Sequence, residues 1–80
     1  MNVCIDLPDF TIKITGADRK HVDHAYERFD NYYDANGLCA LYIEEQKDGS
    51  FEIQTGWMGG ELPDVETVKE QFENWLKEEC

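Results

Sequence analysis

Basic residues are scarce in this chain, and their scarcity limits the partners that it can bind. The 80 residues include 7 Lys and Arg against 18 Asp and Glu, so the formal net charge is −11. Charge of this sign and size repels nucleic acid and anionic membrane surfaces and attracts basic surfaces over long range. We therefore expect a basic protein partner, with no direct binding to nucleic acid or membrane. The competing interpretation is a soluble acidic domain whose charge serves solubility alone.

Long apolar segments and paired cysteines are also missing. No apolar run is long enough to cross a bilayer, and the first residues lack the basic and apolar segments of a signal peptide. The cysteines, Cys4, Cys39 and Cys80, are odd in number and form no CxxC pair, which disfavours a zinc knuckle or a redox site. We expect a cytoplasmic protein with reduced thiols, in which Cys80 is exposed and Cys4 and Cys39 are small fillers in or beside strands.

The sequence also lacks a recognisable catalytic motif. Ser50 is the only serine, and the glycines of segment 56–60 do not have the spacing of a phosphate-binding loop. His21 and His24 are three residues apart with Asp18 nearby, but no convincing further metal ligands accompany them, and both histidines are expected to face solvent. A small plate of helices on a sheet also offers carboxylates little cleft in which to raise their pKa. We predict no enzyme activity, no catalytic residue, no metal and no cofactor.

What is present is the apolar periodicity of a single α+β domain over residues 1–80. Alternation predicts strands, spacings of three and four predict helices, and the expected order is β-α-β-β-α. The predicted architecture is a three- to four-stranded, mainly antiparallel sheet with two helices on one face. The elements are an N-terminal strand region with runs at Val3–Leu7 and Phe10–Thr15, a helix over Arg19–Ala35, strands over Leu38–Glu45 and Phe51–Gly56, and a helix over Val65–Glu78.

The sequence also predicts two turns and the position of one strand in the sheet. Pro8-Asp9 forms either a tight turn or a kink in one long edge strand, and we favour the kink. Segment 47–50 predicts a hairpin turn. Strand 38–45 has apolar residues on both faces, with Cys39, Leu41 and Ile43 on one of them, so we expect it to be central.

The helices have clear apolar faces and end signals. Asp18 is placed to cap the first helix, and Asn36-Gly37 to end it in a left-handed conformation. The apolar residues of the two helices are Val22, Ala25, Tyr26, Phe29 and Tyr33 in the first and Val65, Val68, Phe72, Trp75 and Leu76 in the second.

Four carboxylates, Asp23, Glu27, Asp30 and Asp34, follow one line along the first helix; we name them the acidic stripe. Each like-charged pair four residues apart costs an isolated helix about 0.2–0.5 kcal/mol. The only basic residue that we place near the stripe is Lys20, and the stripe is expected to lie in water. An uncompensated cost of this kind indicates a binding surface. Alternatively, Lys13 or Lys47 neutralises the stripe from the sheet.

Trp57 and Met58, which we name the apolar tip, lie among glycines and are the second candidate contact. Tryptophan is common at the energetic centre of interfaces, and methionine adapts to irregular partners. The alternative for Trp57 is that it closes the end of the core, because residues 51, 53, 55 and 57 share one face of their strand.

In composition and size the chain resembles the small acidic inhibitors of phages and mobile elements, which include anti-CRISPR proteins and other DNA mimics. The resemblance implies a bacterial host cell and a partner that binds nucleic acid, such as a CRISPR-Cas complex. The partner-binding residues would be the acidic stripe and the apolar tip. The residues that carry the resemblance are the stripe, Asp23, Glu27, Asp30 and Asp34, supported by Glu44, Glu45, Asp48, Glu52, Glu66, Glu70 and Glu73.

Two other functions stay open on the sequence. One is an adaptor, antitoxin or immunity-type partner of a basic bacterial protein. The other is a homodimer that pairs through an edge strand or through Tyr32, Trp57 and Met58.

Overall fold

The computed structural model describes residues 2–7, 9–60 and 62–78. Its elements follow the order β-β-α-β-β-α, with a short 3-10 helix, η1, after the first α-helix. The α+β class and the antiparallel sheet are confirmed, and one strand more than in the expected order is present. The bounds are β1 Asn2–Asp6, β2 Thr11–Thr15, α1 Arg19–Tyr33, η1 Asp34–Asn36, β3 Leu38–Glu45, β4 Phe51–Trp57 and α2 Val65–Lys77.

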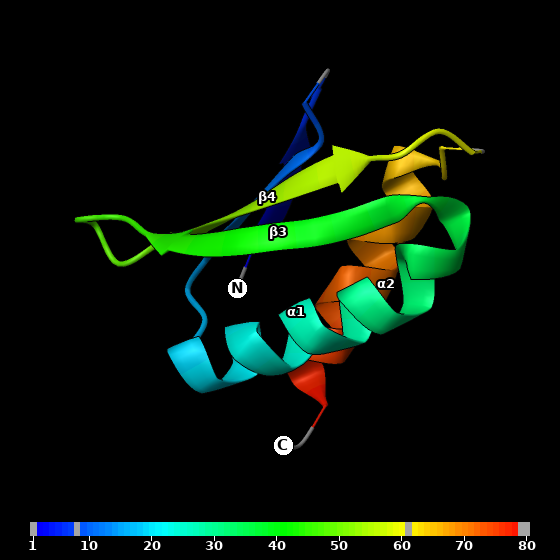
Figure 1. Cartoon of the computed structure of the whole chain (residues 1–80). Coiled ribbons are helices and arrows are strands. Elements are labelled where there is room, and N and C mark those ends of the chain that lie inside the picture. Colours follow the sequence, from blue (N-terminus) through cyan, green and yellow to red (C-terminus); the bar gives the residue numbers. More distant parts are fainter. Residues whose placement is uncertain (1, 8, 61, 79–80) are drawn as a thin grey trace.

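The four strands form one antiparallel sheet in the order β1-β2-β4-β3, so β1 and β3 are its edges. Both helices pack on the same face of the sheet, as Figure 1 shows. Helix α1 lies next to β3, and α2 lies next to β1. The opposite face of the sheet, which we name the outer sheet face, is covered by no helix of the described residues.

The N-terminal strand region is a hairpin, and the favoured kink in one long strand is wrong. Strand β1 pairs with β2 from Asn2↔Thr15 to Asp6↔Thr11. Phe10 closes the turn with a left-handed φ of 58°, and its side chain is buried. The left-handed region is costly for an aromatic residue. Burial of the ring offsets part of that cost. Pro8, which we expected at the turn or kink, lies outside the described residues.

Strand β3 is an edge strand, so its predicted central position is also wrong. A register shift between Ala40 and Tyr42 marks a bulge at Leu41. The bulge changes the expected alternation. Ala40 and Ile43 pack against the core, whereas Leu41 and Tyr42 are exposed.

The remaining turns agree with the predictions, but α1 ends at Tyr33, before the predicted Ala35, and the expected cap by Asp18 does not form. The 47–50 turn joins β3 to β4, and Ser50 donates its backbone N–H to Asp48. Gly37 ends η1 with a φ of 81°, as a left-handed stop requires. Asp64 caps α2 by accepting from the Thr67 N–H, whereas Asp18 stands at the α1 N-cap without a side-chain cap bond.

The core lies between the helix pair and the sheet. The predicted apolar faces of both helices supply it, with Tyr26 and Val65 only partly buried. No helix in the described part of the chain is long and apolar enough to span a membrane. The fully buried large side chains are Phe29, Phe72, Ile12, Ile14, Leu38, Ile53, Val22 and Val68.

The predicted role of Cys4 is wrong, because its side chain is exposed. Val3 and Ile5, its neighbours in β1, point toward the core, so alternation turns Cys4 to the outer sheet face. Cys39 is half-buried, and Cys80 lies outside the described residues.

Candidate partner-binding surface

The acidic stripe lies along the side of α1 that faces the edge strand β3. An open groove of about 460 Å³ runs between these two elements, and we name it the α1–β3 groove. Asp23, Glu27 and Asp30 line it, so the structure brings three members of the stripe to one surface. Asp34 comes after the end of α1, in the first turn of η1. The other lining residues are Arg19, Tyr26 and Ile43.

Asp23 has a basic partner on its own helix. The Arg19 Nε lies 2.9 Å from the Asp23 Oδ1, and the Arg19 Nη1 lies 3.7 Å from the Glu45 Oε1. The guanidinium also stands over the Phe51 ring, 5.9 Å from its centroid. The prediction that only Lys20 lies near the stripe is therefore wrong.

The two lysines considered as alternative partners make no ion pair with the stripe. The Lys13 Nζ lies 2.8 Å from the Asp6 Oδ2 on the neighbouring strand, and this bond and charge raise the pKa of Lys13. Among the described residues, no ion pair joins Lys47 to the stripe.

Asp30 satisfies the backbone of the edge strand. Its Oδ1 accepts a hydrogen bond from the Ala40 N–H at 3.1 Å. That N–H belongs to an edge strand and would otherwise be open to another strand. Asp30 is half-buried as a result, which corrects the expectation that the whole stripe lies in water. Asp30 therefore has a structural role at this place on α1, which is to pair with the backbone of β3.

Asp34 holds the thiol of Cys39. The Cys39 Sγ donates to the Asp34 Oδ1 at 3.4 Å. This hydrogen bond raises the pKa of Cys39, and burial and the negative charges of Asp34 and Asp30 add to the rise. Asp34 is therefore also engaged within the chain.

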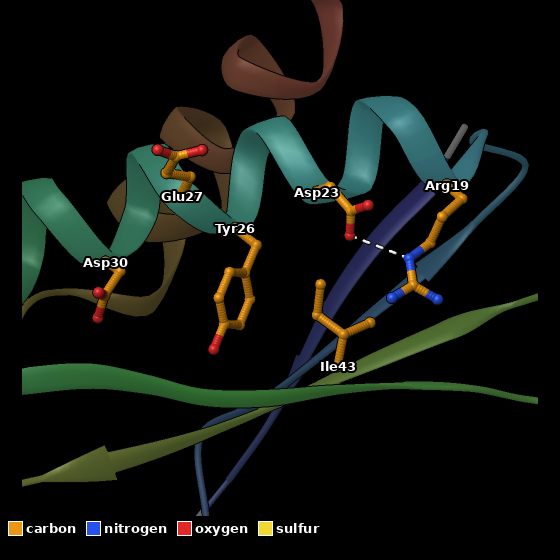
Figure 2. A pocket seen from close by; sticks show the side chains of 6 residues that line it. All are labelled: Arg19, Asp23, Tyr26, Glu27, Asp30 and Ile43. Atoms are coloured by element: carbon orange, nitrogen blue, oxygen red, sulfur yellow. Dashed lines mark hydrogen bonds and ion pairs between the residues drawn. The ribbon is translucent and has the colours of Figure 1, made fainter.

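Glu27 is the one member of the stripe that makes no hydrogen bond or ion pair within the described residues. Figure 2 shows Asp23, Tyr26 and Asp30 pointing from α1 toward β3, whereas the carboxylate of Glu27 points away from that strand. The stripe thus combines one carboxylate directed at solvent with three whose positions are held by internal partners.

The floor of the groove is aromatic and apolar. Tyr26 and Ile43 are both half-buried and approach each other across the gap between α1 and β3 (Figure 2). Partial burial raises the pKa of the Tyr26 hydroxyl, and the nearby Asp30 carboxylate adds to the rise. An apolar floor between carboxylates suits the stem and head of a Lys or Arg side chain.

The apolar tip is exposed, although its base is fixed. Trp57 pairs with Leu38 at the end of β4, and 55% of its surface is exposed, so it does not close the core as the alternative proposed. Met58 is 80% exposed, and its N–H donates to the Gly37 carbonyl at 2.6 Å. The structure does not place the tip in the groove.

The two histidines are half-buried, which corrects the expectation that they face solvent. The His24 Nε2 lies 3.0 Å from the Glu78 Oε1, and the Arg28 Nε lies 3.4 Å from the same oxygen. These contacts join α1 to the end of α2. Within residues 2–7, 9–60 and 62–78, no group of three His, Cys, Asp or Glu side chains could hold a metal ion.

No known protein family, no curated protein and no solved structure matches this chain. The candidate function therefore depends on the residues themselves.

The bond between Asp34 and Cys39 gives a direct test of this part of the surface. We expect Asp34→Asn to speed alkylation of Cys39 severalfold near pH 8, because it removes the charge that disfavours the thiolate. Mass spectrometry of iodoacetamide-treated protein would give the rate at each cysteine, with the exposed Cys4 as the internal control. An unchanged Cys39 rate would contradict the assigned role of Asp34.

Proposed function

We propose that this protein is a non-enzymatic acidic inhibitor that binds the basic, nucleic-acid-binding surface of a partner protein. The partner class, by the resemblance to anti-CRISPR proteins and other DNA mimics, is a nucleic-acid-binding defence complex in the cytoplasm of a bacterial host. The observation that supports this best is the α1–β3 groove, where the Asp23 and Asp30 side chains point toward β3 beside an apolar floor and Glu27 adds a solvent-directed carboxylate. Among the described residues that line the groove, Arg19 is the only basic one.

The hydrogen bond from the edge strand to Asp30 favours binding. A carboxylate held by a backbone N–H, as Asp30 is by Ala40, loses little conformational entropy when a cation reaches its other oxygen. Asp23 is also held in place, by Arg19, but this partner is a cation that a basic partner protein would have to displace or share. The row therefore presents negative charge in a preset geometry, as a nucleic-acid backbone does.

The solvent exposure of the same groove argues against catalysis. Asp23 and Glu27 are exposed, so water surrounds their carboxylates. A general acid or base at neutral pH needs a carboxyl group whose pKa is raised in a secluded site. Exposed carboxylates suit long-range attraction and rapid, salt-dependent association instead.

Amide substitution along the stripe tests the proposal. We expect Asp23→Asn, Glu27→Gln and Asp30→Asn together to weaken binding to a basic partner about tenfold or more at low salt. In Asp30→Asn the side-chain amide oxygen would still accept from the Ala40 N–H, so the fold is preserved. The measurement is capture of the partner from bacterial lysate at about 0.05 M and about 0.5 M salt, followed by titration of the purified partner.

Helix α2 offers a control that removes the same amount of charge. Glu66, Glu70 and Glu73 lie on its outer side, and their replacement by Gln also removes three negative charges. We expect this control to weaken binding much less than the stripe variant. Equal losses would mean that net charge, and not the groove, drives association, and unchanged binding of the stripe variant would refute the proposal.

The apolar tip favours a second function, that of an adaptor or immunity-type partner. Met58 is the most exposed large apolar side chain among the described residues. A partner captured equally well at both salt concentrations, and lost when Trp57 and Met58 are replaced by Ser, would favour that function over the electrostatic one.

A further inference from the structure

The outer sheet face of the β3–β4 hairpin carries exposed apolar side chains that the proposed function does not use. Leu41 is 58% exposed and Tyr42 is 53% exposed, and they are neighbours in the sequence. Two neighbours in a regular strand would point to opposite faces. The bulge between Ala40 and Tyr42 removes that alternation, so that both side chains stay out of the core.

Gly56, on the paired strand, leaves room for this arrangement. A Cβ atom at Gly56 would lie 3.4 Å from the Leu41 Cδ1, so Leu41 rests directly on the glycine backbone. Gly56 pairs with Cys39, and Tyr42 pairs with Gln54. Leu41 and Tyr42 therefore form a low apolar surface on the outer sheet face.

Acidic side chains border this surface. Glu44 lies directly opposite Glu52 on the same face, and like charges in that position destabilise a sheet. Lys13, the next residue in the row, pairs with Glu52 in the register, but its ammonium group bonds to Asp6. The Lys13 ammonium also interacts with the charge of Glu52, so one cation is shared between Asp6 and Glu52. Together with Glu44, these side chains leave the border with a net negative charge.

We propose that Leu41 and Tyr42, together with Glu44 and Glu52, form a second docking surface for a basic protein segment that carries apolar side chains between its Lys or Arg residues. The proposal takes the basic character of the partner from the proposed function and adds the apolar requirement. Charge complementarity selects this occupant. A second copy of the chain would bring the same acidic row, and a net charge of −11, against itself.

The mode of docking is side-chain packing on the sheet face. Adding a strand at the β3 edge would require the Ala40 N–H, which already donates to Asp30. The outer sheet face and the α1–β3 groove lie on either side of β3, so one basic partner can contact both.

Two synthetic peptides with equal numbers of arginines test the proposal, one alternating Arg with Leu and the other Arg with Gly. We expect calorimetry at about 0.3 M salt to show roughly tenfold tighter binding of the Arg-Leu peptide. Leu41→Ser should abolish this preference. Leu7→Ser is the matched control, because Leu7 is 59% exposed and follows β1 at the far edge of the sheet.

Equal binding of the two peptides, or a preference that survives in Leu41→Ser, overturns this inference and leaves the proposed function intact. Failure of both peptides to bind even at low salt overturns both. An Arg-Leu preference that depends on Leu41 while amides in the stripe change nothing supports the docking surface and overturns the electrostatic function.

A substitute variant and a measurement of the oligomeric state complete the test. If Leu41→Ser fails to fold by circular dichroism, Tyr42→Ser takes its place with the same expected loss, and Tyr32→Ser is its control because Tyr32 is 57% exposed. Sedimentation of the parent should give a monomer. A dimer that dissociates on Leu41→Ser would assign the face to a second copy and overturn the inference.

Discussion

Replacing Phe29 with alanine is expected to lower the free energy of unfolding by about 3–5 kcal/mol. Phe29 is fully buried where α1 meets α2. Its ring centroid lies 5.1 Å from that of Tyr33 and 6.1 Å from that of Phe72. The truncation removes these ring contacts and leaves a cavity that two packed helices cannot close. A domain of 80 residues has a total stability of about 4–12 kcal/mol, so much of it would be lost.

Urea denaturation followed by circular dichroism measures this loss, with Phe29→Leu as the control. Leucine keeps most of the apolar volume, and we expect it to cost less than about 1.5 kcal/mol. A loss below about 1.5 kcal/mol for Phe29→Ala would show that the interface of α1 and α2 is loosely packed, contrary to the ring contacts described above.

Those parts of the fold that repeat a local period could be predicted from the sequence. Apolar residues recur at helical spacing in each helix, as Val22 and Ala25 do in α1 and Val68 and Phe72 do in α2. Burial of one face of each helix follows from that spacing. The 47–50 turn and the stop at Gly37 use residues whose backbone preferences are strong. Such signals are local, and the tertiary structure here does not oppose them.

The wrong predictions concern the strands, whose order and register depend on contacts between residues far apart in the sequence. Phe10 adopts a left-handed φ that its residue type disfavours, so no local rule would place it at the end of a turn. The bulge at Leu41 adds one residue to an otherwise plausible alternation, and the alternation alone does not reveal it. The edge position of β3 follows from the strand order, which depends on long-range pairing.

In the candidate site, too, some contacts have a local signal in the sequence and others depend on long-range packing. The bond from Arg19 to Asp23 has a local signal, since oppositely charged residues four apart on a helix form pairs, and sequence reasoning missed it. The bond from the Ala40 N–H to Asp30 has none, because it joins a helix side chain to a strand that follows it in the chain. Sequence reasoning placed four carboxylates on one surface, and the structure brings three of them to the groove and puts Asp34 in η1. Sequence reasoning did not find that three of the four have partners.

The second large effect is expected at Gly60, which follows the apolar tip and passes close to the backbone of η1. A Cβ atom at Gly60 would lie 2.6 Å from the Asn36 carbonyl oxygen, and the φ of Gly60 is 142°. The contact is with backbone, which cannot turn aside as a flexible side chain can. We expect Gly60→Ala to lower the free energy of unfolding by about 2–3 kcal/mol, from the clash and the strained φ together.

The neighbouring glycine separates the two contributions to this loss. Gly59 also has a positive φ, 95°, but a Cβ atom there would meet nothing within 4 Å. Gly59→Ala should therefore show the backbone cost alone, about 1 kcal/mol, in the same urea denaturation. Equal losses in the two variants would mean that the chain near Gly60 yields easily. The close approach of Gly60 to Asn36 would then add nothing to the hydrogen bond from the Met58 N–H to the Gly37 carbonyl, which would alone fix the base of the tip.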